Sequence, residues 1–126
     1  MSSCISAIGT ANPKYRIPQN DIFHFMVRAF RLNDTNASRL KRIYDHSGIE
    51  HRYSVIPDFG EKESNNNTFF GTTADLEPYP GTRDRLSFYQ DNAAELASQA
   101  VHECISNHAE ILPRSITHLI TVSCTG

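Results

Sequence analysis

The sequence predicts an α/β fold in which helices pack against a sheet of buried strands. Three stretches carry this prediction: a small apolar run near the start, a long helix-periodic stretch in the second half, and a β-branched apolar run after it. A helix followed by a hydrophobic strand is half of a βαβ arrangement, whose strands need neighbours on either side. Only two core strands are expected in the 126 residues, so the predicted sheet is incomplete.

The first core strand is expected at residues 4–10, which are small and largely apolar and lead into the loop-forming Asn12-Pro13. A helix should then begin within Pro18-Gln19-Asn20-Asp21, because Asn and Asp suit helix starts. Its apolar residues recur at helical spacing: Ile22, Phe25, Met26, Ala29 and Phe30.

A second helix is predicted to begin with Asn36 or Ser38 as its cap and to end before Gly48. Successive helical residues are rotated by about 100°, so its basic and apolar side chains form adjoining stripes. The apolar stripe, expected to pack inward, consists of Leu40, Ile43 and Tyr44. The basic stripe, expected to stay at the surface, consists of Arg39, Arg42 and His46.

The middle of the chain is expected to contain a short strand and then a long loop. Residues 51–56 alternate loosely and include β-branched and aromatic members, which predicts the strand. Residues 57–81 are rich in Asn, Gly and Pro, with Phe69 and Phe70 as the residues expected to be buried. Polar loops of this length are usually functional or mobile.

The strongest helical periodicity lies in residues 82–109. Pro113 ends the connection that follows, and residues 116–122 predict the second core strand, which runs into Ser123-Cys124-Thr125-Gly126. Because α/β folds place ligands at the carboxyl ends of strands, the chain stops where a site would form. We therefore expect a fragment of a longer domain.

Composition excludes several classes of protein. Twelve Lys and Arg against fourteen Asp and Glu give a net charge of −2, so no global basic field exists for nucleic acid or an anionic membrane. The apolar stretches are too short to cross a bilayer, which takes about 20 residues. The N-terminus lacks the basic region of a secretory signal, and three widely spaced cysteines favour free thiols. These features predict a cytoplasmic protein.

Spacing also disfavours two kinds of site. His102 and Cys104 would point about 200° apart on one helix, so no metal site is expected there. Gly9 and Gly126 lack the glycine spacing of a nucleotide-binding loop. Cys124 lies at a strand end, where a nucleophile is conceivable, but without an indicated histidine partner it is interpreted as a packed small residue.

Three blocks of residues occur in the order seen in one family. They are Ala7-Ile8-Gly9-Thr10-Ala11-Asn12-Pro13, then Lys41-Arg42-Ile43 with Ser47-Gly48-Ile49 and Arg52-Tyr53, and finally Ile116-Thr117-His118-Leu119-Ile120 before a Thr-Gly turn. In this order they resemble the N-terminal part of type III polyketide synthases of the chalcone and stilbene synthase-like kind, whereas residues 57–81 match poorly. The resemblance implies a partial thiolase-like fold, with residues 1–126 as the segment that precedes the catalytic cysteine.

The resemblance further implies a homodimeric acyltransferase that condenses malonyl-CoA units onto an acyl-CoA starter, with CoA thioesters as substrates and no other cofactor. In the family the nucleophilic cysteine and its histidine and asparagine partners come later in the chain. No catalytic residue is therefore expected among these 126 residues, and the segment by itself should be inactive.

Two groups of residues match functional positions of the family. Arg39, Arg42 and His46 match cations that contact CoA phosphates, although His46 stands where the plant enzymes usually have Lys and is largely neutral near pH 7. Cys124 and Thr125 match small polar positions that line the substrate cavity. From spacing alone, the alternative for the basic stripe is a solvated helix face.

Two alternatives to a polyketide synthase remain open. An initiating ketoacyl synthase of fatty-acid synthesis shares the fold and the cysteine chemistry, although residues 7–13 and 116–120 fit the polyketide branch better. The chain could also be a non-catalytic truncated product that at most binds CoA weakly or interferes with dimer formation.

Overall fold

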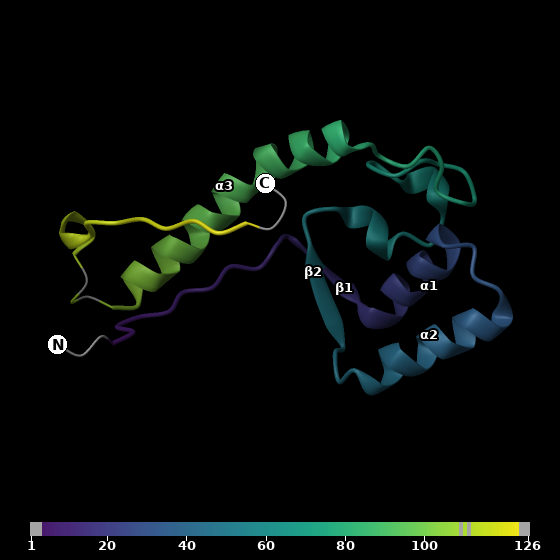
Figure 1. The fold of residues 1–126 in the computed structure, drawn as a ribbon, viewed down its shortest axis with the longest axis horizontal. Coiled ribbons are helices and arrows are strands. Elements are labelled where there is room, and N and C mark those ends of the chain that lie inside the picture. The colour runs from purple at the N-terminus through teal and green to yellow at the C-terminus, as the bar shows by residue number, and fades with distance from the viewer. Residues whose placement is uncertain (1–3, 109, 111, 124–126) are drawn as a thin grey trace. The chain divides into compact units, whose positions relative to one another are not determined.

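The computed structural model describes residues 4–108, 110 and 112–123. The chain divides into two compact units, one comprising Pro13–Arg83 and the other comprising Met1–Asn12 with Asp84–Gly126. Figure 1 shows their strands and helices, which are, in chain order, β1 (Tyr15–Pro18), α1 (Gln19–Ala29), α2 (Asp34–His46), β2 (His51–Ser54) and α3 (Thr82–Ser106).

The unit of residues 13–83 contains a two-stranded antiparallel sheet. Tyr15 pairs with Ser54 and Pro18 pairs with His51, and the two helices α1 and α2 lie between these strands in the chain. β2 confirms the strand expected at residues 51–56. β1 was not predicted, because it is four residues long, ends in proline and buries Ile17 alone of its four side chains.

Helix α1 begins directly after Pro18, as expected, and buries one face. Ile22 and Phe25 of the predicted stripe are buried together with Phe23, whereas Phe30 lies beyond the helix and is exposed. No side chain caps the N-terminus, but Asp21 lies in the first turn, where a negative charge interacts favourably with the helix dipole.

Helix α2 begins earlier than expected because Asn33, rather than Asn36 or Ser38, is its cap. The Oδ1 atom of Asn33 accepts a hydrogen bond of 3.0 Å from the backbone N–H of Asn36. The helix ends at His46, and Gly48 follows with a φ of +68°, the left-handed conformation in which glycine is favoured after a helix.

The segment expected to be a long polar loop contributes the buried Leu76 side chain and several half-buried rings to the core. It contains two short 3-10 turns, Pro57–Gly60 and Ser64–Asn66. The ring of Phe25 packs edge-on against Phe59 and Phe70, at centroid distances of 4.8 and 5.0 Å. Leu76 is fully buried. Phe69 and Phe70, which were expected to be buried, are half-buried, as is Phe59.

Asp58 anchors this segment through a fully buried carboxylate. Its oxygens accept hydrogen bonds of 2.8–2.9 Å from the backbone N–H groups of Thr68, Phe69 and Phe70 and from the Thr68 hydroxyl. Burial acts to raise the pKa of Asp58, but the four hydrogen bonds together outweigh it and hold the pKa below its ordinary value.

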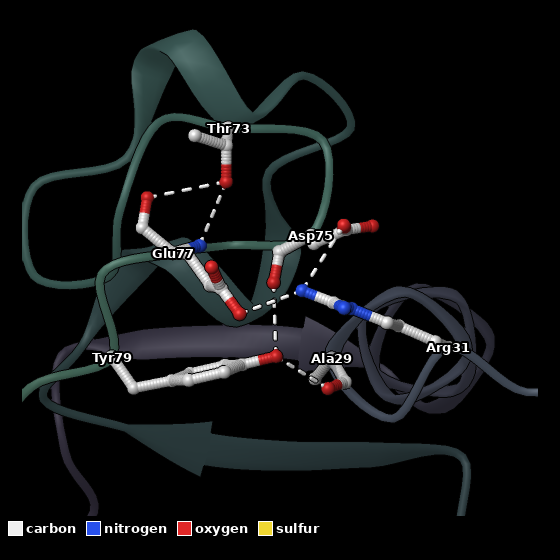
Figure 2. A network of polar contacts seen from close by, with 6 residues as sticks. All are labelled: Ala29, Arg31, Thr73, Asp75, Glu77 and Tyr79. Atoms are coloured by element: carbon white, nitrogen blue, oxygen red, sulfur yellow. Dashed lines mark hydrogen bonds and ion pairs between the residues drawn. The ribbon is translucent and has the colours of Figure 1, made fainter.

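A second polar network ties residues 73–79 to the end of α1 (Figure 2). The Arg31 guanidinium lies 2.6 Å from a Glu77 carboxylate oxygen and 3.2 Å from one of Asp75. The Tyr79 hydroxyl lies within donating distance of the carbonyl oxygens of Ala29, at 2.6 Å, and Asp75, at 2.9 Å. Together with Asp58, this network gives the segment a defined path.

The other unit contains α3, which confirms the long helix expected from periodicity. Gly9 lies directly against it, since a Cβ atom at this position would be 2.3 Å from the Ala100 carbonyl oxygen and 2.4 Å from the Cys104 nitrogen. The backbone N–H of Thr10 donates a hydrogen bond to the Glu103 carboxylate. No helix in the part of the chain that the structure describes is long and apolar enough to cross a membrane.

The two predicted core strands are wrong for this chain. Residues 4–10 and the described residues of 116–122 form no strand, and Leu119, Ile120 and Val122 are 80, 85 and 92% exposed. A strand requires a neighbour that satisfies its backbone N–H and C=O groups. Among the described residues the only paired strands are β1 and β2, so these apolar runs have no partner strand.

Candidate anion-binding face of helix α2

The packing of α2 against α1 determines which of its side chains reach solvent. The ring of Tyr44 contacts that of Phe23 in α1 at a centroid distance of 5.9 Å, and Leu40 is half-buried. Arg39, Arg42 and His46 are exposed. The predicted separation into an inward apolar stripe and an outward basic one is therefore present, except that Ile43 is 67% exposed.

The basic stripe is compact along the helix. With about 100° of rotation per residue, His46 lies about 40° and Arg39 about 60° to the same side of Arg42. The His46 Nδ1 atom is 2.8 Å from the Arg42 carbonyl oxygen. Within the described residues, neither arginine guanidinium has a hydrogen-bond or ion-pair partner. The two guanidiniums are therefore available to an anion.

A groove of about 470 Å³ lies beside this stripe, between α1 and α2. Its lining residues are Phe23, Asp34, Ala37, Ser38, Lys41 and Arg42. Arg42 is the member of the basic stripe that borders the groove, so its guanidinium is placed to contact both a molecule in the groove and an anion on the outer face. The groove was not predicted, because it depends on how α1 and α2 pack.

Lys41 also borders the groove, but its charge is already engaged. Its Nζ atom forms an ion pair with Asp45, one helical turn later, and lies 5.7 Å from the centre of the Phe23 ring. The Lys-to-Asp spacing of four residues could have indicated this pair from the sequence. The two neighbouring cations, Lys41 and Arg42, therefore differ in their freedom to bind a ligand.

The unpartnered guanidiniums of Arg39 and Arg42 are suited to binding phosphate. A guanidinium presents a planar fork of N–H donors that matches two oxygens of one phosphate, and charge-assisted hydrogen bonds are about twice as strong as neutral ones. Two arginines three residues apart have Cβ atoms about 5–6 Å apart and can bind one anionic group together or two adjacent ones.

A second groove, also of about 470 Å³, is lined by α1 and the segment after the first 3-10 turn. Arg28 lies in it and donates to the carbonyl oxygens of Lys62, at 2.5 Å, and Glu61, at 2.6 Å. Its terminal nitrogens therefore hold the segment in place, which leaves the face of α2 as the stronger candidate for ligand binding.

The remaining predicted site residues are not brought together with this face. Cys124 and Thr125, the predicted cavity wall, lie outside the described residues. Among the residues that are described, no three His, Cys, Asp or Glu side chains are grouped so as to hold a metal ion.

The chain is similar to a curated protein in sequence and to a solved structure in fold. No family model matches the chain. The chain is 27% identical over 122 residues to the type III polyketide synthase pspB of Penicillium soppii, a match that covers 97% of the chain and 28% of pspB. The crystal structure of PKS-I from the brown alga Ectocarpus siliculosus superposes with a TM-score of 0.64 and 26% identity, over 83% of this chain and 27% of that one.

The chain thus spans little more than a quarter of the length of these relatives. The similarity to PKS-I confirms the expected mixed α/β architecture as part of a thiolase-like fold. The similarity extends over nearly the whole chain in sequence and over most of it in structure. In sequence and in fold, the chain resembles part of a type III polyketide synthase.

Proposed function

We propose that this chain is the N-terminal segment of a type III polyketide synthase, an acyltransferase that condenses malonyl-CoA units onto an acyl-CoA starter. The similarity to pspB and to PKS-I supports this assignment, because it covers 97% of the chain in sequence and 83% of it in structure. The complete enzyme is proposed to be a cytoplasmic homodimer that uses CoA thioesters without a further cofactor.

The proposed contribution of this segment is to hold the phosphates of coenzyme A on the outer face of α2. The observation that carries this proposal is the unpartnered guanidinium of Arg42 at the rim of the α1–α2 groove. Arg39 lies on the same exposed face and adds a second fork of donors, and His46 adds a third polar group. The diphosphate and the 3′-phosphate of CoA provide several oxygens for such donors.

The chemical step is assigned to residues that follow in the longer enzyme. In this family a cysteine carries the acyl group, and a histidine and an asparagine stabilise the thioester oxygen as malonyl loses carbon dioxide. The segment therefore binds substrate without reacting with it.

Binding of coenzyme A to the 126-residue chain tests the proposal. Isothermal titration calorimetry should detect binding of coenzyme A, much weaker binding of pantetheine, which lacks the phosphates, and intermediate binding of dephospho-coenzyme A. Equal affinity for coenzyme A and pantetheine would show that the phosphates are not recognised. The basic stripe would then be interpreted as a solvated helix face.

A further inference from the structure

The hydrogen bond of His46 determines the state of its ring. The Nδ1 atom lies 2.8 Å from the Arg42 carbonyl oxygen, which can only accept, so Nδ1 carries the hydrogen. In the neutral ring the Nε2 atom is then an acceptor with a lone pair. Because His46 is exposed at the end of α2, this second nitrogen is accessible from solvent.

The two protonation states of this ring differ in what they offer a phosphate. A neutral ring presents the Nε2 lone pair, which repels phosphate oxygens. A protonated ring keeps the bond from Nδ1 to the Arg42 carbonyl and gains an N–H donor and a positive charge at Nε2. Protonation therefore adds a donor to the anion-binding face without disturbing the existing contact.

Several charged residues lie close to His46 along α2. Arg42 is one turn before it and Arg39 nearly two turns before it, on the same side, and Asp45 is adjacent but paired with Lys41. In the described part of the chain, no charged side chain of another element is within ion-pair or hydrogen-bonding distance of His46. A phosphate bound on this face would place a negative charge beside the ring and would favour its protonated form.

We infer that His46 makes phosphate binding on α2 proton-coupled, so that coenzyme A binds with uptake of a proton and more tightly as the pH falls through the range in which imidazole titrates. This inference rests on the proposed function, because it concerns the same face of α2. It assigns to His46 a regulatory contribution that a lysine, charged throughout this range, does not supply.

Calorimetry with coenzyme A at pH 6, 7 and 8 tests the inference. Titrations at pH 7 in two buffers of different ionisation enthalpy give the number of protons taken up. The unaltered chain should take up a fraction of a proton, and His46→Gln and His46→Lys should take up less. Because the 3′-phosphate itself titrates near pH 6, His46→Gln serves as the matched control for the ligand's own contribution.

The ratio of affinities at pH 6 and pH 8 should be about two- to fivefold larger for the unaltered chain than for His46→Gln, the contribution expected of an exposed ion pair. His46→Lys should follow the pH profile of His46→Gln but bind more tightly at pH 8. Identical profiles for the unaltered chain and His46→Gln, with binding still sensitive to Arg42→Ala, would overturn the inference and leave the proposed function standing. Absence of saturable binding at every pH would overturn both.

A measurement on the unaltered chain makes the test independent of the variants. The imidazole proton resonances of His46, followed by NMR against pH, should titrate at higher pH when the chain is saturated with coenzyme A than when it is free. An unchanged titration in saturated protein would contradict the inference.

Discussion

Arg42 and Lys41 carry the same charge at adjacent positions, yet their surroundings give them different roles. The Lys41 ammonium is paired with Asp45 and lies over the Phe23 ring, whereas the Arg42 guanidinium has no partner in the described part of the chain. The positive charge of a paired cation is partly neutralised by its partner, and the cation must break that contact to bind an anion. Position in the sequence alone therefore does not decide which of the two cations is available to bind an anion.

This difference predicts unequal effects of two substitutions. Arg42→Ala should weaken coenzyme A binding by about tenfold, since one charge-assisted hydrogen bond at the surface contributes near the lower end of about 1.5–3 kcal/mol. Lys41→Ala removes the same charge from the same helix and should change the dissociation constant by less than about threefold. Calorimetric titration of both variants at pH 7 measures the contrast, and equal losses would show that net charge, not geometry, governs binding.

Asp58 should give the unit of residues 13–83 a characteristic sensitivity to acid. Its folded pKa lies below the ordinary value of 3.8, so the unfolded chain binds the proton more readily. The stability that Asp58 contributes is therefore fully present above about pH 4 to 5 and is lost as the pH falls through the folded pKa. Urea unfolding between pH 3 and pH 7 measures this slope.

Asp58→Asn isolates this contribution from that of the other carboxylates. The amide offers one acceptor oxygen in place of two and directs its own donors at backbone N–H groups. We expect a loss of about 3 kcal/mol in the free energy of unfolding at pH 7 and a shallower decline below pH 5. If the variant retains the full acid dependence of the unaltered chain, the buried carboxylate is not its source.

At the scale of elements, the helices were predictable and most of the strands were not. The hydrogen bonds of a helix lie within its own segment, so the spacing of apolar residues sufficed to locate α1, α2 and α3 within a few residues. The hydrogen bonds of a strand come from elsewhere in the chain. Residues 116–122 have a strand-like composition but no neighbour to pair with, whereas the short β1 pairs with β2 despite its weak pattern.

The candidate site was also predictable only where it depends on residues of a single helix. Arg39, Arg42 and His46 share one helix face, so periodicity was enough to group them. The groove beside them is lined by Phe23 of α1 and Ser38 of α2. No local sequence pattern indicates that these two residues lie close together. The four-residue spacing of Lys41 and Asp45 was the one available signal that Lys41 is engaged.

The segment after the 3-10 turns depends on a close backbone approach at Gly71. Its N–H donates to the Leu76 carbonyl oxygen at 3.0 Å, and a Cβ atom at this position would lie 1.8 Å from the Glu77 carbonyl oxygen. Gly71→Ala should therefore displace the turn that buries Leu76 and lower the free energy of unfolding by about 2 kcal/mol. Thermal or urea unfolding followed by circular dichroism measures the loss.

Gly60→Ala is the matched control for that substitution. A Cβ atom at Gly60 would meet the Ile17 side chain at 3.4 Å, an ordinary van der Waals distance. The change in stability should stay within about 0.5 kcal/mol, because an alanine fits there and reduces the entropy of the unfolded chain. Comparable losses for the two variants would argue that backbone freedom, not crowding at Gly71, matters in this segment.

At the scale of the whole molecule, the burial of apolar side chains is uneven. Ile17, Ile22, Phe23, Phe25 and Leu76, the buried hydrophobic residues in the described part of the chain, all lie in the unit of residues 13–83. In the other unit no residue of α3 is buried, and the apolar run at residues 116–122 is exposed where the structure describes it. Exposed apolar runs with unpaired backbone groups promote association between chains.

The isolated 126-residue chain should consequently self-associate through this apolar run. Sedimentation velocity over a tenfold range of concentration should show a weight-average mass that rises with concentration. Replacing Ile120 and Val122 together with Lys should lower that mass at every concentration, because charges on an exposed strand-like segment oppose edge-to-edge pairing. Ile43→Lys, at an apolar residue 67% exposed on α2, adds charge elsewhere and should have a smaller effect. A chain that stays monomeric, with one sharp thermal transition, would show that residues 116–122 are covered within the monomer.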